Sequence, residues 1–110
     1  MAFQTQSRHH WREERSAAAG GVSEPVLLPR RIDGVTAVVV PGAGGSAYVE
    51  YTLSDARMVL EGDPGTIWIP WESGSVVTAT ARALAGPVIA LRLQAVGQPA
   101  VLQVAAWADF

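Results

Sequence analysis

The chain has 110 residues, a formal net charge of −2 and no cysteine, so disulfides and thiolate metal sites are excluded. Its length allows one domain at most. Its longest apolar run falls far short of the roughly 20 residues that span a bilayer, and Arg8, His9 and His10 stand where a signal peptide would have its apolar stretch. We therefore expect a protein that is made in the cytosol and has no membrane partner.

The charges divide the chain at residue 31. Residues 1–31 carry five arginines and three acids and are poor in large apolar groups, whereas residues 32–110 carry three arginines and seven acids. We expect residues 1–31 to form an extended N-terminal arm that cannot bury itself and gains order against a partner. The remaining residues, 32–110, form a small domain that is only marginally stable in isolation, because a domain of this size buries only about 60% of the surface that its unfolded chain exposes. This favours a homo-oligomer or docking on a larger body. The basic excess is weak for a nucleic-acid partner, since phosphate neutralisation recruits about six to ten cations.

Within the arm, the helix formers of Trp11–Ala19 allow one or two helical turns. Pro25 and Pro29 bracket an extended segment, Val26–Leu28, which we expect on a sheet edge, where proline is tolerated.

The domain begins with two predicted strands. Val35–Val40 is rich in β-branched residues, and apolar residues alternate along Ala47–Leu53. The Gly-rich loop between them, residues 41–46, predicts a hairpin. This loop superficially resembles a phosphate-cradling loop, but a strand follows its glycines where a dinucleotide fingerprint needs a helix. Ser54 as N-cap and Gly62 as a C-terminal stop then predict a short helix between them.

Four more strands follow, each bounded by Gly or Pro turns: Thr66–Trp71, Ser75–Leu84, Val88–Val96 and Ala100–Trp107. The second of these is ambiguous, because its β-branched residues favour a strand and the residues from Ala79 to Ala85 would tolerate a helix. Pro70 places the first of these on an edge. The last two alternate on either side of a Gly-Gln-Pro turn and predict a second hairpin. Six to seven short strands with one short helix predict an all-β fold, either a small β-sandwich or a partly open barrel.

No set of residues in the sequence has the pattern of an active site. The histidines, His9 and His10, are adjacent in the arm, and no third ligand completes a metal site. Because these two histidines are the only ones and both lie in the arm, the sequence does not support a Ser-His-Asp triad. Acidic pairs such as Glu61 and Asp63 lie in turns, which do not supply the burial that a catalytic acid needs. We therefore predict no enzymatic activity and no cofactor or metal.

The tryptophans and the arm arginines are the candidate partner-binding residues. Trp68 and Trp71 are three positions apart on a strand, so they point to opposite faces, one into the core and one outward, unless loops or the arm cover both. An exposed Trp suits a protein interface or a sugar ring. Trp11 has no obvious core to join, and Trp11→Ala is predicted to weaken partner binding by about 2 kcal/mol or more. The full set is Arg8, Trp11, Arg12, Arg15, Arg30, Arg31, Trp71, Trp107 and Phe110.

Four segments resemble small β proteins encoded among the virion genes of tailed bacteriophages and prophages. These are Val38–Gly42 with Gly44-Gly45, Val49–Ser54, the Trp68…Trp71…Gly74 spacing, and Leu84–Arg92. The similarity covers about residues 35–105, so the arm lies outside it. The resemblance implies a virion structural protein of the head decoration (cement) type, which binds the major capsid protein on the head shell. A neck or tail component is the alternative within the virion, and a carbohydrate-binding β module is the alternative of another class.

Overall fold

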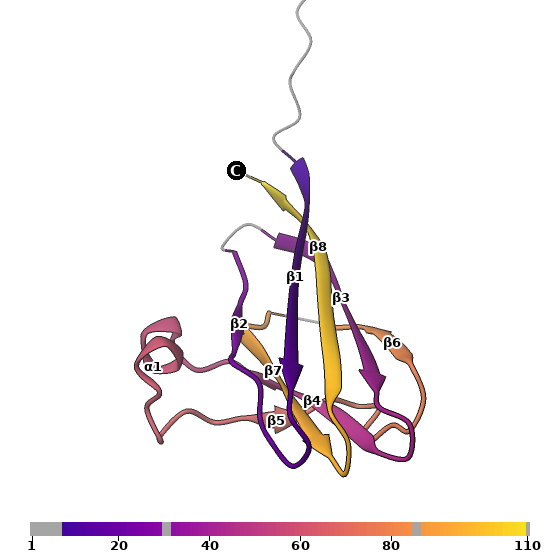
Figure 1. Cartoon of the computed structure of the whole chain (residues 1–110). Coiled ribbons are helices and arrows are strands. Elements are labelled where there is room, and N and C mark those ends of the chain that lie inside the picture. The colour runs from indigo at the N-terminus through magenta and orange to yellow at the C-terminus, as the bar shows by residue number, and fades with distance from the viewer. Residues whose placement is uncertain (1–7, 30–31, 85–86, 110) are drawn as a thin grey trace, which may run out of the picture.

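The computed structural model describes residues 8–29, 32–84 and 87–109, which form eight strands and one short helix (Figure 1). The strands are β1 (Arg8–Ala17), β2 (Val26–Leu27), β3 (Ile32–Pro41), β4 (Ser46–Thr52), β5 (Ile69–Pro70), β6 (Thr80–Ala83), β7 (Ala90–Val96) and β8 (Ala100–Asp109). They make two antiparallel four-stranded sheets, with the order β1-β8-β3-β6 in sheet A and β2-β7-β4-β5 in sheet B. The predicted all-β sandwich is confirmed.

The expected arm is wrong for residues 8–17, which form a full strand of sheet A. All ten residues of β1 pair with β8, from Arg8 opposite Asp109 to Ala17 opposite Ala100, without a shift of register. Alternate residues of β1 point toward sheet B, and among them Ala17 is buried and Trp11 packs against the core. A sheet edge tolerates charged side chains, so the polar composition that suggested an arm, or a helix over Trp11–Ala19, belongs to an edge strand.

The second part of the expected arm also joins the sandwich. Val26 of β2 lies opposite Leu91 of β7 and is fully buried. The prolines on either side of this segment predicted an edge strand, and β2 is the edge of sheet B. The connection between β1 and β2 is held to β7 as well, because Ser23 Oγ accepts from the Leu93 N–H at 2.9 Å.

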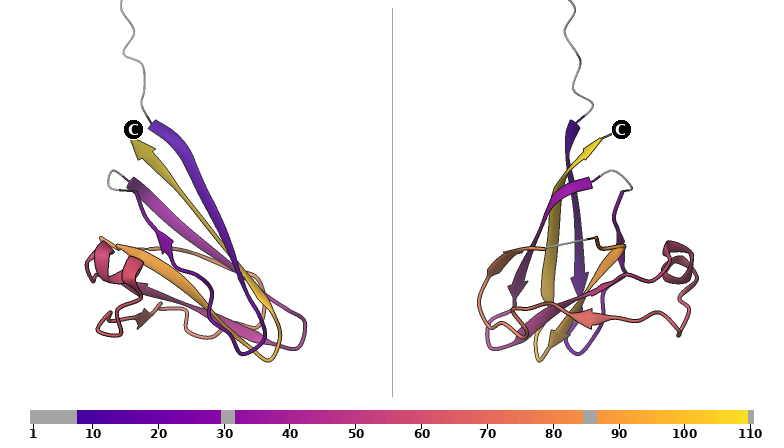
Figure 2. Two further views of the ribbon diagram at one scale, coloured as in Figure 1. Left: turned by 60° about the vertical axis from the view of Figure 1, so that its left-hand side comes forward. Right: turned by 180° about the vertical axis from the view of Figure 1, so that it is seen from behind.

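Both predicted hairpins are wrong, because each turn joins the two sheets instead of two neighbouring strands. β3 lies in sheet A and β4 in sheet B, and likewise β8 lies in sheet A and β7 in sheet B. The two turns pack together, with the Gly42 N–H donating to the Pro99 carbonyl at 2.9 Å. Figure 2 shows the consequence: the sheets converge at this end and spread apart toward the other.

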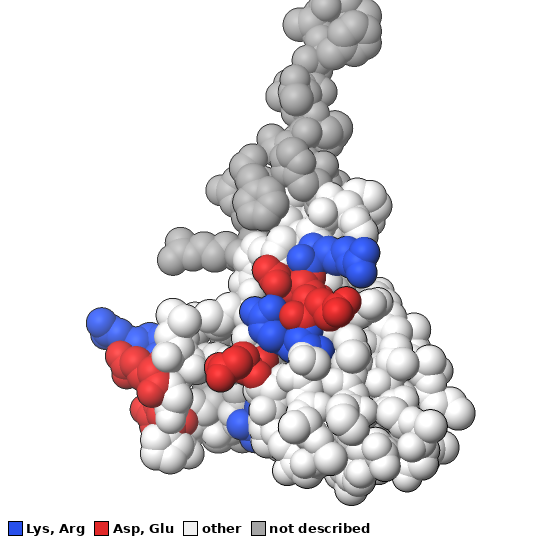
Figure 3. All heavy atoms as spheres, in the orientation of Figure 1, with Lys and Arg blue, Asp and Glu red and all other residues white. Residues whose placement is uncertain are grey.

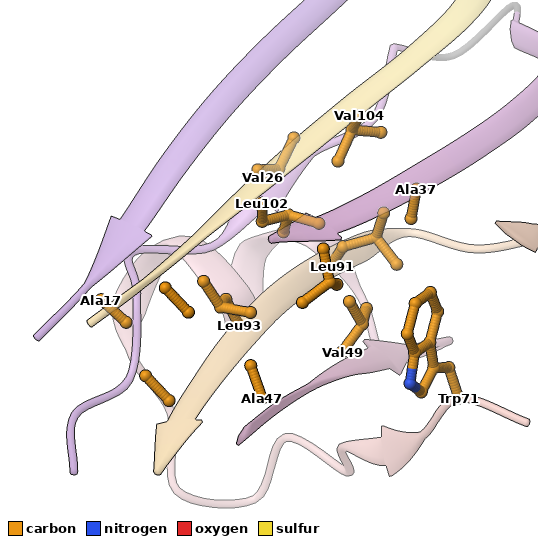
Figure 4. Packing of buried hydrophobic residues seen from close by; sticks show 13 residues of the cluster. Ala17, Val26, Ala37, Ala47, Val49, Trp71, Leu91, Leu93, Leu102 and Val104 are labelled. Carbon is orange, nitrogen blue, oxygen red and sulfur yellow. The ribbon is translucent and has the colours of Figure 1, made fainter. Parts of the chain in front are cut away.

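Side-chain size follows this wedge shape. Near the converging end the core residues are alanines: Ala17, Ala47, Ala95 and Ala100. Further from the turns the core is filled by Val49, Leu91, Leu102, Val104 and the Trp71 ring, among others (Figure 4). Since protein interiors pack at near-crystalline density, small side chains are required where the sheets approach and large ones where they diverge.

A long connection from β4 to β5 carries the helix α1 (Ala56–Glu61), which lies beside sheet B (Figure 1). Gly62 ends it in the left-handed conformation with φ 65°, as predicted. The predicted N-cap is wrong: Asp55 caps the helix through its side chain, which accepts from the Arg57 N–H at 2.9 Å. Ser54 Oγ instead accepts from the Ile67 N–H across the connection. No helix in the described ranges is long and apolar enough to cross a membrane.

Candidate functional site: the outer face of sheet A

Strand alternation gives sheet A a face that points away from sheet B, which we call the outer face of sheet A. The cross-strand register defines it row by row: Arg12, Ala105, Thr36 and Ala83 form one row, and Glu14, Gln103, Val38 and Ala81 form the next. A third row holds Ser16, Val101 and Val40. Charges on these rows are confined to β1, and the rows over β8, β3 and β6 are alanine, valine, threonine and glutamine.

The space-filling view agrees with this register. In Figure 3, blue and red atoms gather over β1 and reach across the adjacent part of β8, where Glu14 Oε2 accepts from Gln103 Nε2 at 3.1 Å, and the surface to the lower right of them is uncharged. Antiparallel sheets with one face in water usually alternate apolar-in and polar-out. The outer face of sheet A departs from that pattern, since Val38, Val40, Val101 and Ala105 stand at outward positions.

An aromatic pair lies on the same face, toward the diverging end of the sandwich. His10 of β1 and Trp107 of β8 are directly opposed, with ring centroids 5.5 Å apart and an edge-to-face angle of 62°. Trp107 keeps 48% of its surface exposed, and Val40 at the other end of the face keeps 42%. Tryptophan is enriched among the residues that dominate the binding energy of protein interfaces.

The structure separates the residues that the sequence grouped as partner-binding. Arg12 is exposed on the outer face, whereas Trp11 and Arg15 are half-buried on the inner side of β1. Arg15 is held within its own strand, since its Nη1 donates to Glu13 Oε2 at 3.0 Å and to the Glu14 carbonyl at 2.9 Å. The prediction that Trp11 has no core to join is therefore wrong.

The remaining predicted site residues divide into three cases. Trp71 is only 2% exposed, and its indole Nε1 donates to the Gly74 carbonyl at 2.6 Å, so it is a core residue and the partner-binding prediction for it is wrong. Arg8 begins β1, and its side chain is not described. Arg30, Arg31 and Phe110 lie outside the described residues.

The sequence did not predict a second polar cluster, on the outside of sheet B. Glu50 of β4 is 9% exposed, and its Oε1 accepts from Arg92 Nε and Gln94 Nε2 of β7, both at 2.8 Å. The Arg92 guanidinium in turn lies over the Trp68 ring, 4.3 Å from its centroid. The sequence does contain an acid and a base, Glu50 and Arg92, at outward positions of two strands with alternating apolar residues. They could not be recognised as a pair without knowing that β4 lies beside β7. Glu50 therefore fixes the Arg92 side chain, and the Arg92–Trp68 contact holds the β4–β5 connection against sheet B.

Two shallow grooves of about 750 Å³ each flank this connection. One is mainly apolar and is lined by Leu28, Ile32, Val35, Leu84, Val88 and Ile89, among others. The other is mixed, with Leu27, Val59, Asp63, Trp68 and Arg92 among its lining residues. Among the described residues, neither groove holds a group of three or more His, Cys, Asp or Glu side chains that could bind a metal ion.

The Gly-rich loop at residues 41–46 packs closely against the other turn that joins the two sheets, residues 97–99. A Cβ on Gly42 would lie 2.6 Å from the Pro99 carbonyl oxygen, and one on Gly45 would lie 2.8 Å from the Val96 carbonyl oxygen. These glycines are therefore required where two backbones approach closely. The strand that follows them, β4, excludes the helix that a dinucleotide-binding loop needs.

Comparison with known proteins adds no assignment: a scan against family models, a search of curated proteins and a search of solved structures each found no match.

Proposed function

We propose that this chain is a structural protein of a tailed-bacteriophage virion, of the head decoration type, that binds the major capsid protein through the outer face of sheet A. The resemblance of residues 35–105 to small β proteins of virions gives the class. The observation that carries the docking surface is that β8, β3 and β6 contribute no charged residue to the three rows from Thr36 to Val40, next to the charged strand β1. The chain would then be found on the outside of the phage head.

The chemistry of this face suits binding to a large, preformed protein surface. Apart from Gln103 and Trp107, its side chains on β8, β3 and β6 are short, so little conformational entropy is lost when they are covered. Val40, Val101 and Ala105 offer apolar contact, and Trp107 offers the large amphipathic side chain that is enriched at interface centres. Arg12 and Glu14 border the face and would form the polar rim that such interfaces have.

The proposal is tested by co-sedimentation of the purified chain with assembled heads of the phage or prophage that encodes it. The variant Ala105→Glu puts a carboxylate in the middle of the outer face, opposite Arg12, where it can be accommodated in the folded chain. The matched control is Ala56→Glu at the start of α1, on the other side of the sandwich. We expect the wild type and Ala56→Glu to sediment with heads and Ala105→Glu to stay in solution.

Two results would contradict the proposal. If the wild-type chain fails to sediment with heads, the decoration role is wrong, and binding to isolated necks or tails instead would assign it to that part of the virion. If Ala105→Glu binds heads as well as Ala56→Glu does, the outer face of sheet A is not the docking surface. The carbohydrate-binding alternative loses one of its two platforms, because Trp71 is in the core, and one face of the Trp68 ring is covered by Arg92.

A further inference from the structure

The four edge strands of the described sandwich differ sharply in length. β2 and β5 have two residues each and β6 has four, and β5 also carries Pro70. Short edges and proline are common means of preventing strand addition. β1 has ten residues, no proline, and a continuous register with β8, so it presents a long, regular row of backbone donors and acceptors at the edge of sheet A, bordered by charged side chains on both faces.

The outward charges of β1 would pair with those of a second, antiparallel copy of the same strand. Arg12 and Glu14 lie on the same face of the strand, two positions apart. When a second copy of β1 pairs antiparallel with the first and Glu13 lies on the two-fold axis, each Arg12 lies directly opposite Glu14 of the second copy. Directly opposed residues in such a pair have Cβ atoms about 4.5–5.5 Å apart, which brings opposite charges into contact.

Neighbouring registers that keep the faces aligned lose this match. A shift that centres the pair on Arg12 opposes two arginines. A shift that centres it on Glu14 opposes two glutamates and leaves Arg12 opposite Ser16, and the Glu13–Arg15 contacts that it creates only replace the pair that these residues already form within each chain. The register centred on Glu13 also opposes two like charges, but each Glu13 is bound at 3.0 Å by Arg15 of its own chain. The Arg12 side chain, in contrast, makes no ion pair or hydrogen bond within the described residues.

We propose that two copies of this chain associate through their β1 strands, antiparallel and centred on Glu13, to form one continuous eight-stranded sheet. The two-fold axis is perpendicular to the sheet, so both outer faces of sheet A point to the same side. Backbone hydrogen bonds along residues 9–17 supply the attraction, as in other cases of strand addition, and the two Arg12–Glu14 pairs fix the register. This association does not depend on capsid binding, since it concerns the isolated chain.

The first test is the mass of the purified chain in sedimentation equilibrium, for the wild type, R12E, E14R and an equal mixture of the two variants. We expect the wild type to have twice the mass of one chain. R12E and E14R should each be monomeric, because both contact positions then carry like charges. The mixture should restore the dimer, because positions 12 and 14 are both acidic in R12E and both basic in E14R. Each contact between position 12 of one chain and position 14 of the other then joins opposite charges.

The second test is a cross-link on the two-fold axis. The chain has no cysteine, so E13C carries a single thiol, and two such thiols would lie on directly opposed residues. Their Cα atoms would be about 4.5–5.5 Å apart, within the usual range of about 4.4–6.8 Å for a disulfide. The matched control is E24C, an exposed position outside β1. We expect air oxidation to convert E13C, but not E24C, to a covalent dimer.

Two outcomes would overturn the proposal. One is a wild-type chain that stays monomeric at the highest soluble concentration. The other is a dimer that R12E and E14R leave intact and in which E13C does not cross-link, because that dimer uses another surface. Circular dichroism of the two charge variants checks that they are folded, and recovery of the dimer in their mixture excludes misfolding as the cause of its loss.

Discussion

Trp11 of β1 lies opposite Ala106 of β8, and its ring packs against the buried core from the edge of sheet A. This contact joins residues 8–17 to the sandwich, although their composition is that of a solvated segment. The outward charges of the strand, Arg12 and Glu14, lie in water, and its inward charges, Glu13 and Arg15, pair with each other at 3.0 Å.

We predict that Trp11→Ala lowers the free energy of unfolding by about 2 kcal/mol, because a half-buried indole loses roughly half of the contacts that make buried Trp→Ala changes cost about 3–5 kcal/mol. Urea unfolding followed by circular dichroism measures the change. The control is Glu24→Ala, an exposed residue outside β1, which should change stability by less than about 0.5 kcal/mol. Equal stability of the two variants would show that β1 does not pack on the core.

We predict that Arg92→Ala destabilises the fold by about 2 kcal/mol, because the Glu50 carboxylate, with 12% of its side chain exposed, loses its charged partner. Thermal and urea unfolding measure the effect. Arg57→Ala is the control, since the Arg57–Glu61 pair on α1 has side chains that are 84% and 64% exposed and should contribute less than about 0.5 kcal/mol. If both substitutions lower the stability by a similar amount, the Glu50–Arg92 pair is not a buried ion pair.

We predict that Gly45→Ala destabilises the fold by about 3 kcal/mol, because the new methyl group would meet the backbone of the opposite turn at 2.8–2.9 Å. Gly44→Ala is the matched control one residue away. Its Cβ meets no atom within 4 Å, and the cost is only that of a non-glycine residue at φ +83°, about 1 kcal/mol. The order of the two melting temperatures is the measurement, and a lower melting temperature for Gly44→Ala would contradict the packing of the two turns.

We predict that Trp71→Phe costs about 1–2 kcal/mol of stability, because the Gly74 carbonyl loses the indole N–H that donates to it at 2.6 Å. The proposed function also predicts that this variant, once folded, binds phage heads as strongly as the unmodified chain, since Trp71 is in the core. Unfolding and co-sedimentation are measured on the same preparation. A folded Trp71→Phe protein with weakened head binding would return Trp71 to the candidate interface.

The alternation of apolar residues was enough to predict most of the strands and their inward faces. Leu91 and Leu93 of β7, and Leu102 and Val104 of β8, are buried as the period of two required. The stop of α1 at Gly62 was also readable, because a left-handed C-terminal residue favours glycine.

The pairing of those strands could not be read from the same residues. A Gly/Pro turn between two alternating segments is compatible with a hairpin in one sheet and with a crossing between two sheets, and both turns here cross. The Glu50–Arg92 pair was hidden for that reason, since it exists only because β4 neighbours β7. β1 was missed because an edge strand with charges on both faces, such as Arg12 and Glu13, lacks apolar alternation.

The place of β1 at the edge of sheet A is tested most directly by residue-resolved amide hydrogen exchange across Trp11–Ser16 in the isolated chain, measured over a range of concentrations. At low concentration every second amide should exchange slowly, since in an antiparallel pair alternate residues donate to β8 and the others face the open edge. At high concentration the remaining amides should become protected as β1 strands pair. Uniformly fast exchange at all concentrations would contradict both the strand and its pairing.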